Sequence, residues 1–451
     1  MKELKFYVMT DPHFYETSLG ASGPEYDDFM RYEQKCYAET ESINRSVAEY
    51  LKGADEADII LIVGDLSFNG EKESHRSFVK LLKEIEESGK KVYVVTADHD
   101  CQEHPFAFGE KGRYEPEGTP RDELFDIYYE FGFKDAIAVD RQHLSYVAQL
   151  GEGVRLLALN NDGADDGRRR FDEKHCQWIR EQIRKAKEDG QMIIAMNHYP
   201  LLPLQPLFSI ISSTVQKEPM NAIELLADEG VNLVLTGHMH CQSINEITTK
   251  KGNKLYDVCT GSIIADPAYI RLVTVKDENT VDIKSIPTPD FEWDTDGRSC
   301  KQYLTDMFNN MILNILYDMK YDTERMMRKF HIEDKKALRP VIYLIGCLLN
   351  SITLGGFSRL FWIKCHKSIR KIKVMDFAAE LVRGAFVGNQ QMKEGTPEGD
   401  VLLAFLKRIN PVLKRINLKN VYGERVDLFE LLKHTAGNYG TDDYNAVLTL
   451  R

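Results

Sequence analysis

Five short segments in the first 240 residues each place metal-binding side chains directly after an apolar run. The runs, at residues 4–9, 59–63, 91–96, 192–196 and 231–236, are short and largely apolar, which predicts strands. The segments after them are Asp11-Pro12-His13, Gly64-Asp65, Asp98-His99-Asp100, Asn197-His198 and Gly237-His238-Met239-His240. Because loops converge on a ligand at the carboxyl ends of strands in an α/β sheet, the pattern favours that fold class, with the segments meeting at one edge.

The same side chains predict which ligand this edge binds. Carboxylates and imidazoles suit divalent first-row metals, and seven or eight such groups exceed the needs of one ion. A single Asp or His after a strand is more often a turn former or a helix cap, so the prediction rests on the whole set. The set predicts a site for two metal ions.

The order of the five segments resembles that of the calcineurin-like metallophosphoesterases over about residues 2–286. The pattern of that family runs Asp-x-His, Gly-Asp, Gly-Asn-His, His and Gly-His-x-His. The resemblance implies a four-layer α/β/β/α sandwich with two divalent ions, of Mn, Fe or Zn. It also implies an enzyme that hydrolyses a phosphoester through a hydroxide that bridges the two ions.

The resemblance gives each position a role. The implied ligands of the first ion are Asp11, His13 and His240, and those of the second are Asp98, His198 and His238. Asp65 would bridge both ions. The imidazole of His99 would protonate the leaving oxygen or bind the phosphoryl group.

The third segment departs from the family's pattern at a metal ligand. This chain has Ala97-Asp98-His99 where the family usually has Gly-Asn-His, so a carboxylate replaces a neutral amide. The added charge is expected to hold the second ion more tightly, weaken it as a Lewis acid and repel an incoming phosphate. Ala97 disfavours a positive φ where the family has glycine, and so is expected to affect the placement of His99. We expect lower activity or an altered metal preference.

Residues beside the segments are further candidates. Asp100 would orient a ligand or His99, or cap the helix that follows. His104 and Tyr199 are expected to line the pocket because they adjoin metal-binding residues. Arg168, Arg169 and Arg170 follow a predicted strand at 154–160 and would bring guanidinium groups to a diester, or form an exposed turn.

A stretch rich in Pro and Asp at 287–297 predicts a boundary between a metallophosphoesterase domain, 1–289, and an all-α C-terminal domain, 290–451. Apolar residues spaced three and four apart predict helices at 302–319, 369–386, 401–409 and 426–432. The apolar stretch 340–363 is long enough for a membrane span, but Asn350, Gly355-Gly356 and Arg359 predict two short buried helices. The basic run at 364–373 is expected to be a solvated helix face, or to meet anionic lipid or phosphate.

Composition limits the class of protein and its partners. At 451 residues the chain exceeds one typical hydrophobic core, so two domains are expected. Residues 1–289 carry 50 acidic and 33 basic side chains, whereas 290–451 carry 20 and 25. The net charge of −12 and the absence of an extended basic tract argue against binding to duplex nucleic acid. Eight cysteines without C-x-x-C spacing, and a strand that begins at the N-terminus, predict free thiols and a cytoplasmic location.

These patterns predict a metal-dependent phosphoric ester hydrolase. Some bacterial metallophosphoesterases with a helical C-terminal addition are similar to cyclic nucleotide phosphodiesterases, so a small diester is the expected substrate. A phosphomonoester or a phospholipid headgroup is the alternative. The competing hypothesis is an interaction scaffold whose metal site has lost catalysis, because Asp98 replaces a neutral ligand.

Overall fold

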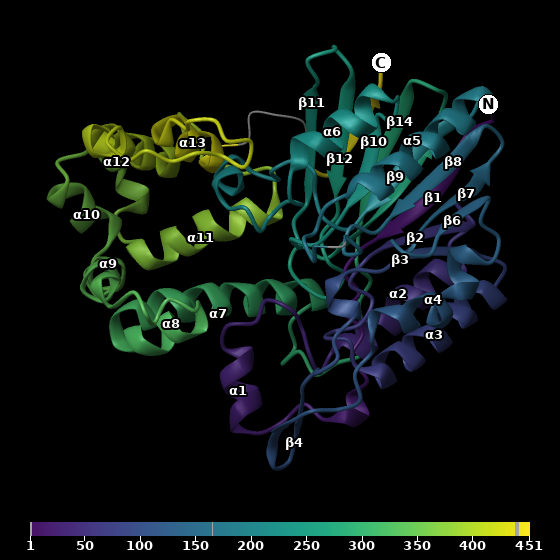
Figure 1. Cartoon of the computed structure of the whole chain (residues 1–451). Coiled ribbons are helices and arrows are strands. Elements are labelled where there is room, and N and C mark those ends of the chain that lie inside the picture. The colour runs from purple at the N-terminus through teal and green to yellow at the C-terminus, as the bar shows by residue number, and fades with distance from the viewer. Residues whose placement is uncertain (1, 165, 438–441) are drawn as a thin grey trace.

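The computed structural model describes residues 2–164, 166–437 and 442–451, and two mixed β-sheets form the centre of its first part (Figure 1). The first sheet has the order β15-β14-β13-β1-β2-β3 and the second β11-β12-β10-β9-β8-β7-β6. The strands of the first sheet are β1 (Leu4–Met9), β2 (Ile59–Val63), β3 (Lys91–Val95), β13 (Tyr269–Val275), β14 (Thr280–Pro287) and β15 (Ala446–Thr449). Those of the second are β6 (Ala138–Asp140), β7 (Ser145–Gly151), β8 (Val154–Leu159), β9 (Met192–Asn197), β10 (Leu233–Thr236), β11 (Ser243–Thr248) and β12 (Lys254–Cys259).

Helices cover the outer face of each sheet, which gives four layers. The first sheet packs on α2 (Thr40–Gly53) and α3 (Lys72–Glu87), and the second on α5 (Glu173–Glu188) and α6 (Pro219–Asp228) (Figure 1). Central strands such as β2 are apolar throughout because both of their faces are buried. The predicted α/β/β/α sandwich is therefore confirmed. Smaller elements lie in its loops: α1 (Pro24–Met30), α4 (Leu124–Ile127) and the hairpin of β4 (Ala107–Gly109) and β5 (Gly112–Tyr114).

Parallel pairing brings the five segments to one edge of the sandwich. Strands β1, β2 and β3 run parallel in the first sheet, and β8, β9, β10 and β12 do so in the second. Each of the five segments follows the carboxyl end of one of these strands. These strands lie within two residues of the ranges that the sequence predicts, and the largest difference is at β10, which begins at Leu233 instead of Val231.

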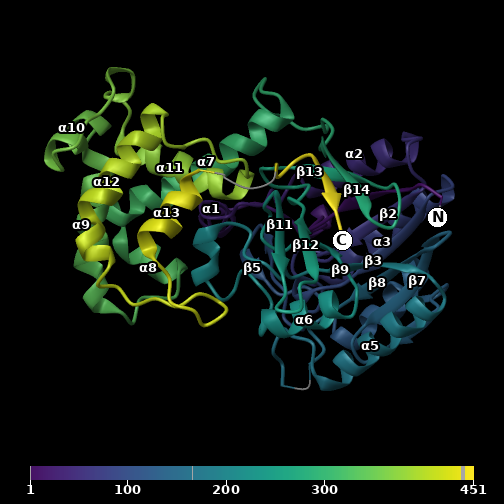
Figure 2. The same cartoon turned by 90° about the horizontal axis from the view of Figure 1, so that it is seen from above.

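The C-terminal region is helical and lies beside the sandwich (Figures 1 and 2). Its helices are α7 (Cys300–Tyr321), α8 (Thr323–Lys329), α9 (Arg339–Ser351), α10 (Leu354–Leu360), α11 (Val374–Val387), α12 (Pro397–Leu413) and α13 (Leu428–Ala436). The Arg31 guanidinium bonds both carboxylate oxygens of Asp318 on α7, at 2.9 and 2.8 Å, and so ties the two parts together. The last strand, β15, returns to the first sheet and pairs with β14, which the predicted division of the chain does not anticipate.

The apolar stretch 340–363 forms two short helices, but the prediction that both are buried is wrong for α9. Its single fully buried residue is Gly346, where a Cβ atom would lie 2.5 Å from the backbone of Met319 on α7. The turn between α9 and α10 falls at Ile352–Thr353, and Gly355-Gly356 lies inside α10. Among the described residues, no helix has the length and apolar character needed to cross a bilayer.

His75 on α3 links the sandwich to the third metal-binding segment. Its Nε2 donates to the Asp100 carbonyl at 2.9 Å, and its Nδ1 lies 2.7 Å from the Tyr128 hydroxyl, which donates to it. Both ring nitrogens are satisfied in the neutral form, and burial lowers the pKa of His75 to about 4. The ring is therefore uncharged in the folded chain near neutral pH.

This buried histidine predicts a loss of stability in mild acid. The unfolded chain gains a proton on His75 below about pH 6.5, whereas the folded chain stays neutral there until about pH 4. The contribution is present above pH 6.5 and lost as the pH falls toward 4. Between pH 7 and 5, we expect the free energy of unfolding to fall about 2 kcal/mol more in the parent than in His75→Gln. Denaturant titrations at both pH values measure this, with the exposed His104→Gln as control, and equal falls in parent and His75→Gln would contradict it.

Candidate metal centre

Two groups of carboxylates and imidazoles meet at the shared edge of the sheets. The first contains Asp11, His13 and His240, with 3.1 Å between the two Nε2 atoms and 3.4 Å from Asp11 Oδ1 to His240 Nε2. The second contains Asp65, Asp98, His198 and His238. Asp65 Oδ2 lies 3.1 Å from His198 Nε2 and 3.6 Å from His13 Nε2, so this carboxylate stands between the groups. The seven residues predicted as metal ligands are thus brought together.

The unpaired atoms of these side chains fit bound cations. His198 Nε2 and Asp98 Oδ1 are buried without a hydrogen-bond partner, which is unusual for buried polar atoms. Two imidazole nitrogens and a carboxylate oxygen within 4 Å form a donor set typical of divalent first-row metals. The residues present therefore suit the two ions that the sequence predicts.

Backbone carbonyls orient the second pair of imidazoles. His198 Nδ1 donates to the Val63 carbonyl at 2.9 Å, which directs Nε2 toward Asp65. His238 Nε2 donates to the Ser213 carbonyl at 3.1 Å, which leaves Nδ1 for the group. Hydrogen bonds of this kind fix the tautomer and the direction of a metal-binding ring.

The charges in the group shift its pKa values in opposite directions. Burial alone would raise the pKa of Asp65, but the neighbouring imidazoles of His198 and His99 hold it well below its usual range. Burial likewise opposes the charged form of His198, yet the carboxylate of Asp65 raises the pKa of that ring. The carboxylate is therefore ionised and able to bind a cation.

The backbone turns sharply at five of the seven residues. Asp11, His13, Asp65, His238 and His240 all have φ between 38° and 71°, a left-handed conformation that costs energy for residues with a Cβ atom. Gly64 also has positive φ, and a Cβ there would lie 2.3 Å from His198 Nδ1. At Gly237 a Cβ would lie 2.4 Å from Asp11 Oδ2. The glycines of the segments make room for the ligands.

Ala97 does not have the effect expected from its sequence position. Its φ of −143° is extended backbone, so replacing glycine there creates no strain. His99 still lies beside the first group, with its ring centre 4.9 Å from that of His13. The expectation that Ala97 alters the placement of His99 through a positive φ is therefore wrong.

His99 and Asp100 connect the third segment to the second. His99 Nδ1 donates to the Phe68 carbonyl at 2.8 Å, and its backbone N–H donates to Asp65 Oδ1 at 3.3 Å. Burial, and then the positive charge of Lys35, lower the pKa of His99. Asp100 is fully buried and accepts from the backbone N–H groups of Ser67 and Ala97, both at 2.8 Å. Asp100 thus holds together the two loops that carry Asp65 and Asp98.

Asp98 is paired with an arginine. Its Oδ2 accepts a hydrogen bond from Arg169 Nη2, while its Oδ1 is left without a partner. The guanidinium carbon of Arg169 lies 5.0 Å from the ring centre of Tyr199, and that ring lies 4.5 Å from the ring of His238. One arginine of the basic triplet therefore offsets the extra negative charge of this site.

The other candidates that adjoin the segments lie in different places. Tyr199 is buried beside His198 and His238, and its hydroxyl has no hydrogen-bond partner. His104 is exposed and pairs with Glu115 at 2.9 Å, away from the metal-binding groups. Arg168 and Arg170 pair with Asp166, at 2.9 and 3.0 Å. The structure thus brings Tyr199 and Arg169 to the centre, but not His104, Arg168 or Arg170.

Two charged residues of the centre, Lys35 and Asp162, are not among the candidates that the sequence predicts. Lys35 is buried, its ammonium group lies 4.4 Å from the ring centre of Phe68, and its charge lowers the pKa of both His13 and His99. Burial, and then the charge of Asp98, raise the pKa of Asp162 to about 7. Lys35 lies in a loop after α1 with no motif around it, so no sequence signal identifies it. The adjacency of Asp162 to the arginine triplet is the one signal for that residue.

A third group of possible ligands, Asp140, His143 and His175, has a different geometry. His143 lies between Asp140 and Asp172, with ring nitrogens 2.6 and 3.2 Å from their carboxylates. The rings of His143 and His175 are stacked with 1° between their planes and 4.3 Å between their centres. Both ring nitrogens of His143 thus contact carboxylates, and because in-plane lone pairs of stacked rings lie in separate parallel planes, the two rings do not converge on one ion. We interpret the group as a structural contact that attaches α5 to the second sheet.

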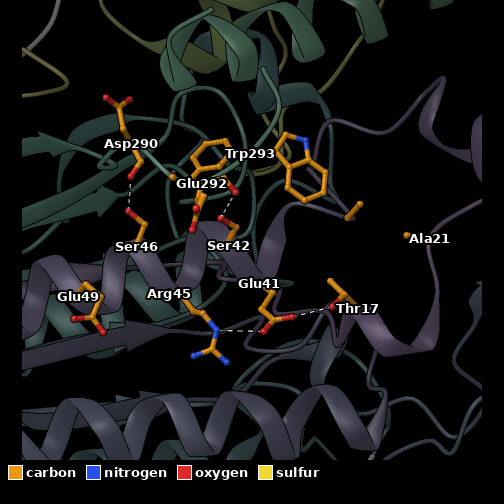
Figure 3. A pocket seen from close by; sticks show the side chains of 12 residues that line it. Thr17, Ala21, Glu41, Ser42, Arg45, Ser46, Glu49, Asp290, Glu292 and Trp293 are labelled. Carbon is orange, nitrogen blue, oxygen red and sulfur yellow. Dashed lines mark hydrogen bonds and ion pairs between the residues drawn. The ribbon is translucent and has the colours of Figure 1, made fainter. Parts of the chain in front are cut away.

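One groove lies away from the metal-binding residues. It has a volume of about 780 Å³ between α2 and residues 290–293 (Figure 3). Ser42 and Ser46 of α2 donate to the carbonyls of Glu292 and Asp290, at 2.8 and 2.6 Å, and so fix its wall. None of the seven predicted ligands lines it.

Comparison with known proteins decides the family. Residues 4–242 match the model of the calcineurin-like phosphoesterases, and this span includes all five segments. The chain belongs to the calcineurin-like phosphoesterase family. With its buried Asp and His groups, this family member is a metal-dependent phosphoesterase with a site for two metals. No curated protein matches the chain.

Several solved structures are similar to this family member at low sequence identity. A dimetal phosphatase from Danio rerio is 11% identical, with a TM-score of 0.42, over 63% of this chain and 96% of its own. A purple acid phosphatase from yellow lupin seeds, Lupinus luteus, is 16% identical, with a TM-score of 0.44, over 64% and 52%. A 5'-nucleotidase from Staphylococcus aureus, described as putative, is 11% identical, with a TM-score of 0.39, over 84% and 72%.

Substitution of Gly64 tests whether metal binding needs the free space beside the His198 ring. Gly64→Ala is expected to displace the His198 ring and to lower the bound metal by about one ion per chain, because the new Cβ would overlap that ring. Gly89→Ala is the matched control, since Gly89 also has positive φ but has open space around it. Both variants share the conformational cost of about 1 kcal/mol. Elemental analysis after manganese loading measures the difference, and equal metal content in the two variants would refute it.

Proposed function

We propose that this phosphoesterase hydrolyses a small phosphodiester, such as a cyclic nucleotide-like compound, with water as the nucleophile. The observation that carries the proposal is the carboxylate of Asp98 in a group where the family usually has a neutral amide. A phosphomonoester carries up to two negative charges near neutral pH, whereas a diester carries one. Because this carboxylate engages the guanidinium of Arg169, that cation is less available to a second substrate charge, which favours a diester over a monoester.

In this proposal the seven converging residues hold two divalent ions. Asp11, His13 and His240 bind the first, Asp98, His198 and His238 bind the second, and Asp65 contacts both, as its place between the two groups supports. Two such ions supply Lewis acidity toward a phosphoryl oxygen and activate water for in-line attack. The mixed carboxylate and imidazole set accepts Mn, Fe or Zn.

His99 is our candidate for the proton donor to the leaving oxygen. Its Nδ1 is occupied by the Phe68 carbonyl, so Nε2 is the atom left for a substrate oxygen. The lowered pKa of this buried ring makes its protonated form a stronger acid than an exposed imidazolium. Its position beside His13 supports a role at the reacting phosphorus.

Two cationic side chains lie near enough to act on substrate charge. Lys35 is close enough to His99 and His13 for its charge to lower their pKa values, which supports binding of a phosphoryl oxygen there. Arg169 is shared with Asp98, so its charge is mostly compensated. With Arg169 engaged by Asp98, Lys35 is the cationic side chain that we expect to contact the ester, and one such contact suits a singly charged diester.

We also propose a reducing compartment such as the cytoplasm. All eight cysteines are free thiols, and four of them are buried. Burial raises the pKa of buried thiols such as Cys36, Cys241 and Cys259, which makes them poor nucleophiles. Buried thiols of this kind fit a structural role in a compartment where cysteines are not oxidised to disulfides.

The proposed function is tested by measuring the rates at which the protein hydrolyses two classes of phosphoester. Metal-loaded protein is assayed with an aryl phosphodiester and an aryl phosphomonoester, and we expect the diester to be preferred. His99→Ala is expected to lower kcat for the diester by a factor of roughly 100 to 10,000, because general acid catalysis contributes that much. His104→Ala is the matched control, since His104 is exposed and lies outside the centre.

Each contrary result has a distinct meaning. Preference for the monoester would replace the diester proposal with the phosphomonoesterase alternative. No turnover by the parent, with recovery in Asp98→Asn, would support a scaffold whose carboxylate has suppressed catalysis.

The pairing of Asp98 with Arg169 predicts that removal of either charge changes the affinity for metal, in opposite directions. Arg169→Gln leaves the carboxylate uncompensated and is expected to tighten manganese binding at one site about tenfold or more. Asp98→Asn leaves the guanidinium uncompensated and is expected to weaken binding by a similar factor, and the double variant should return close to the parent. Calorimetric titration measures all four proteins without reference to activity. Arg168→Gln is the control, since Arg168 pairs with Asp166, and the same affinity in both arginine variants would disprove the compensation.

A further inference from the structure

The helical region contains a segment whose charge is opposite to that of the chain as a whole. Residues 335–373 include nine lysines and arginines and no Asp or Glu, although the chain has a net charge of −12. Six of the nine fall within 359–373, as Arg359, Lys364, Lys367, Arg370, Lys371 and Lys373. A tract of this sign creates a local positive potential that the acidic remainder of the chain does not share.

All six of these basic side chains are exposed. Among the residues that the structure describes, none of the six forms an ion pair, whereas Arg339 at the start of α9 pairs with Glu324 at 2.8 Å. Exposed apolar side chains lie between them in the sequence: Leu360 is 60% exposed and Trp362 is 84% exposed. Large apolar groups this exposed have a considerable cost in water, so their position among unpaired cations points to a partner.

Helix α9 adds a second exposed apolar surface. Val341, Leu344 and Ile345 share one face of the helix by their spacing, and they are 51%, 65% and 44% exposed. Leu348 and Leu349, near the end of α9, pack on the small core of Leu354, Phe357 and Ile369. Helix α9 and the basic segment are thus parts of one packed unit. Figures 1 and 2 both show α9 and α10 at the end of the helical region farthest from the sheets.

We propose that this end, formed by α9 and residues 359–373 and here named the tip surface, binds the surface of an anionic lipid bilayer. Exposed leucine, valine and tryptophan side chains insert at the boundary of headgroups and acyl chains, and tryptophan favours that boundary. The surrounding lysines and arginines bind lipid phosphates and carboxylates. The proposal concerns a surface remote from the metal centre and does not depend on which ester is hydrolysed.

Two other partners fit the tip surface less well. A nucleic acid would use the cations, but it would leave the aliphatic faces of α9 and Leu360 without a partner, and residues 1–289 with a net charge of −17 would repel it. A second copy of this chain, packed symmetrically, would bring the same unpaired cations against each other. The combination of aliphatic, tryptophan and unpaired basic side chains favours the bilayer.

Vesicle flotation with the full chain tests the proposal. We expect the protein to float with vesicles of equal parts phosphatidylcholine and phosphatidylglycerol, but not with phosphatidylcholine alone, and added salt should weaken binding. Replacing Lys364, Lys367 and Lys371 by Gln is expected to weaken binding on the order of 100-fold, since three charges near an anionic surface are lost. Lys83, Lys250 and Lys284, also exposed but on the sandwich, provide the matched triple Gln control.

Tryptophan fluorescence reports insertion independently of charge. Brominated lipids are expected to quench the fluorescence of the parent and of Trp293→Leu, in which a half-exposed tryptophan between β14 and α7, in the groove beside α2, is removed. Quenching should be lost in Trp362→Leu. Circular dichroism of each variant verifies the fold.

Several results would overturn the proposal. These are failure of the parent to float with anionic vesicles, equal flotation with neutral ones, and equal weakening by the two lysine triples. Displacement from vesicles by duplex DNA through the same lysines would assign the tip surface to nucleic acid instead. A dimer in light scattering that protects Trp362 from a soluble quencher would assign it to a second copy.

Discussion

Three carboxylates and four imidazoles converge at the edge where the two sheets meet, and groups buried this way are stable only when they are paired or bind ions. Much of the sandwich acts to bring these side chains together. Parallel strands deliver the segments to one edge, left-handed turns aim the side chains inward, and Gly64 and Gly237 leave space for His198 and Asp11. The strain of those turns persists because the surrounding strands are fully buried and fix the backbone.

The ion pair of Asp98 and Arg169 shows how a changed ligand is accommodated. Asp98 keeps one oxygen without a partner and gives the other to a guanidinium, so the pair resembles a neutral ligand in its net charge. Arg169 is held in turn over the ring of Tyr199, beside the imidazoles of His198 and His238. A carboxylate alone would change the electrostatics of the centre, whereas a carboxylate with its own cation changes them far less.

The two parts of the chain carry opposite charges for physically separate tasks. The sandwich concentrates carboxylates where cations bind, and the tip surface concentrates cations where anionic headgroups would bind. Distance keeps the two from neutralising each other, since charges separated by more than a Debye length are largely screened. The bilayer proposal also gives a reason for the exposure of α9, which the apolar character of residues 340–363 had led us to place in the core.

The sequence by itself determined the strands, the α/β/β/α class and the seven converging residues, because apolar runs and the ligands after them are local patterns. It identified neither Lys35 nor the pairing of Asp98 with Arg169, because these contacts join loops that are 33 and 71 residues apart and leave no periodic signal. Likewise, the extended backbone of Ala97 and the return of β15 to the first sheet follow from neighbouring strands and not from local preference. Tertiary structure decided which charges meet, since electrostatic contacts depend on distance in space and not on separation along the chain.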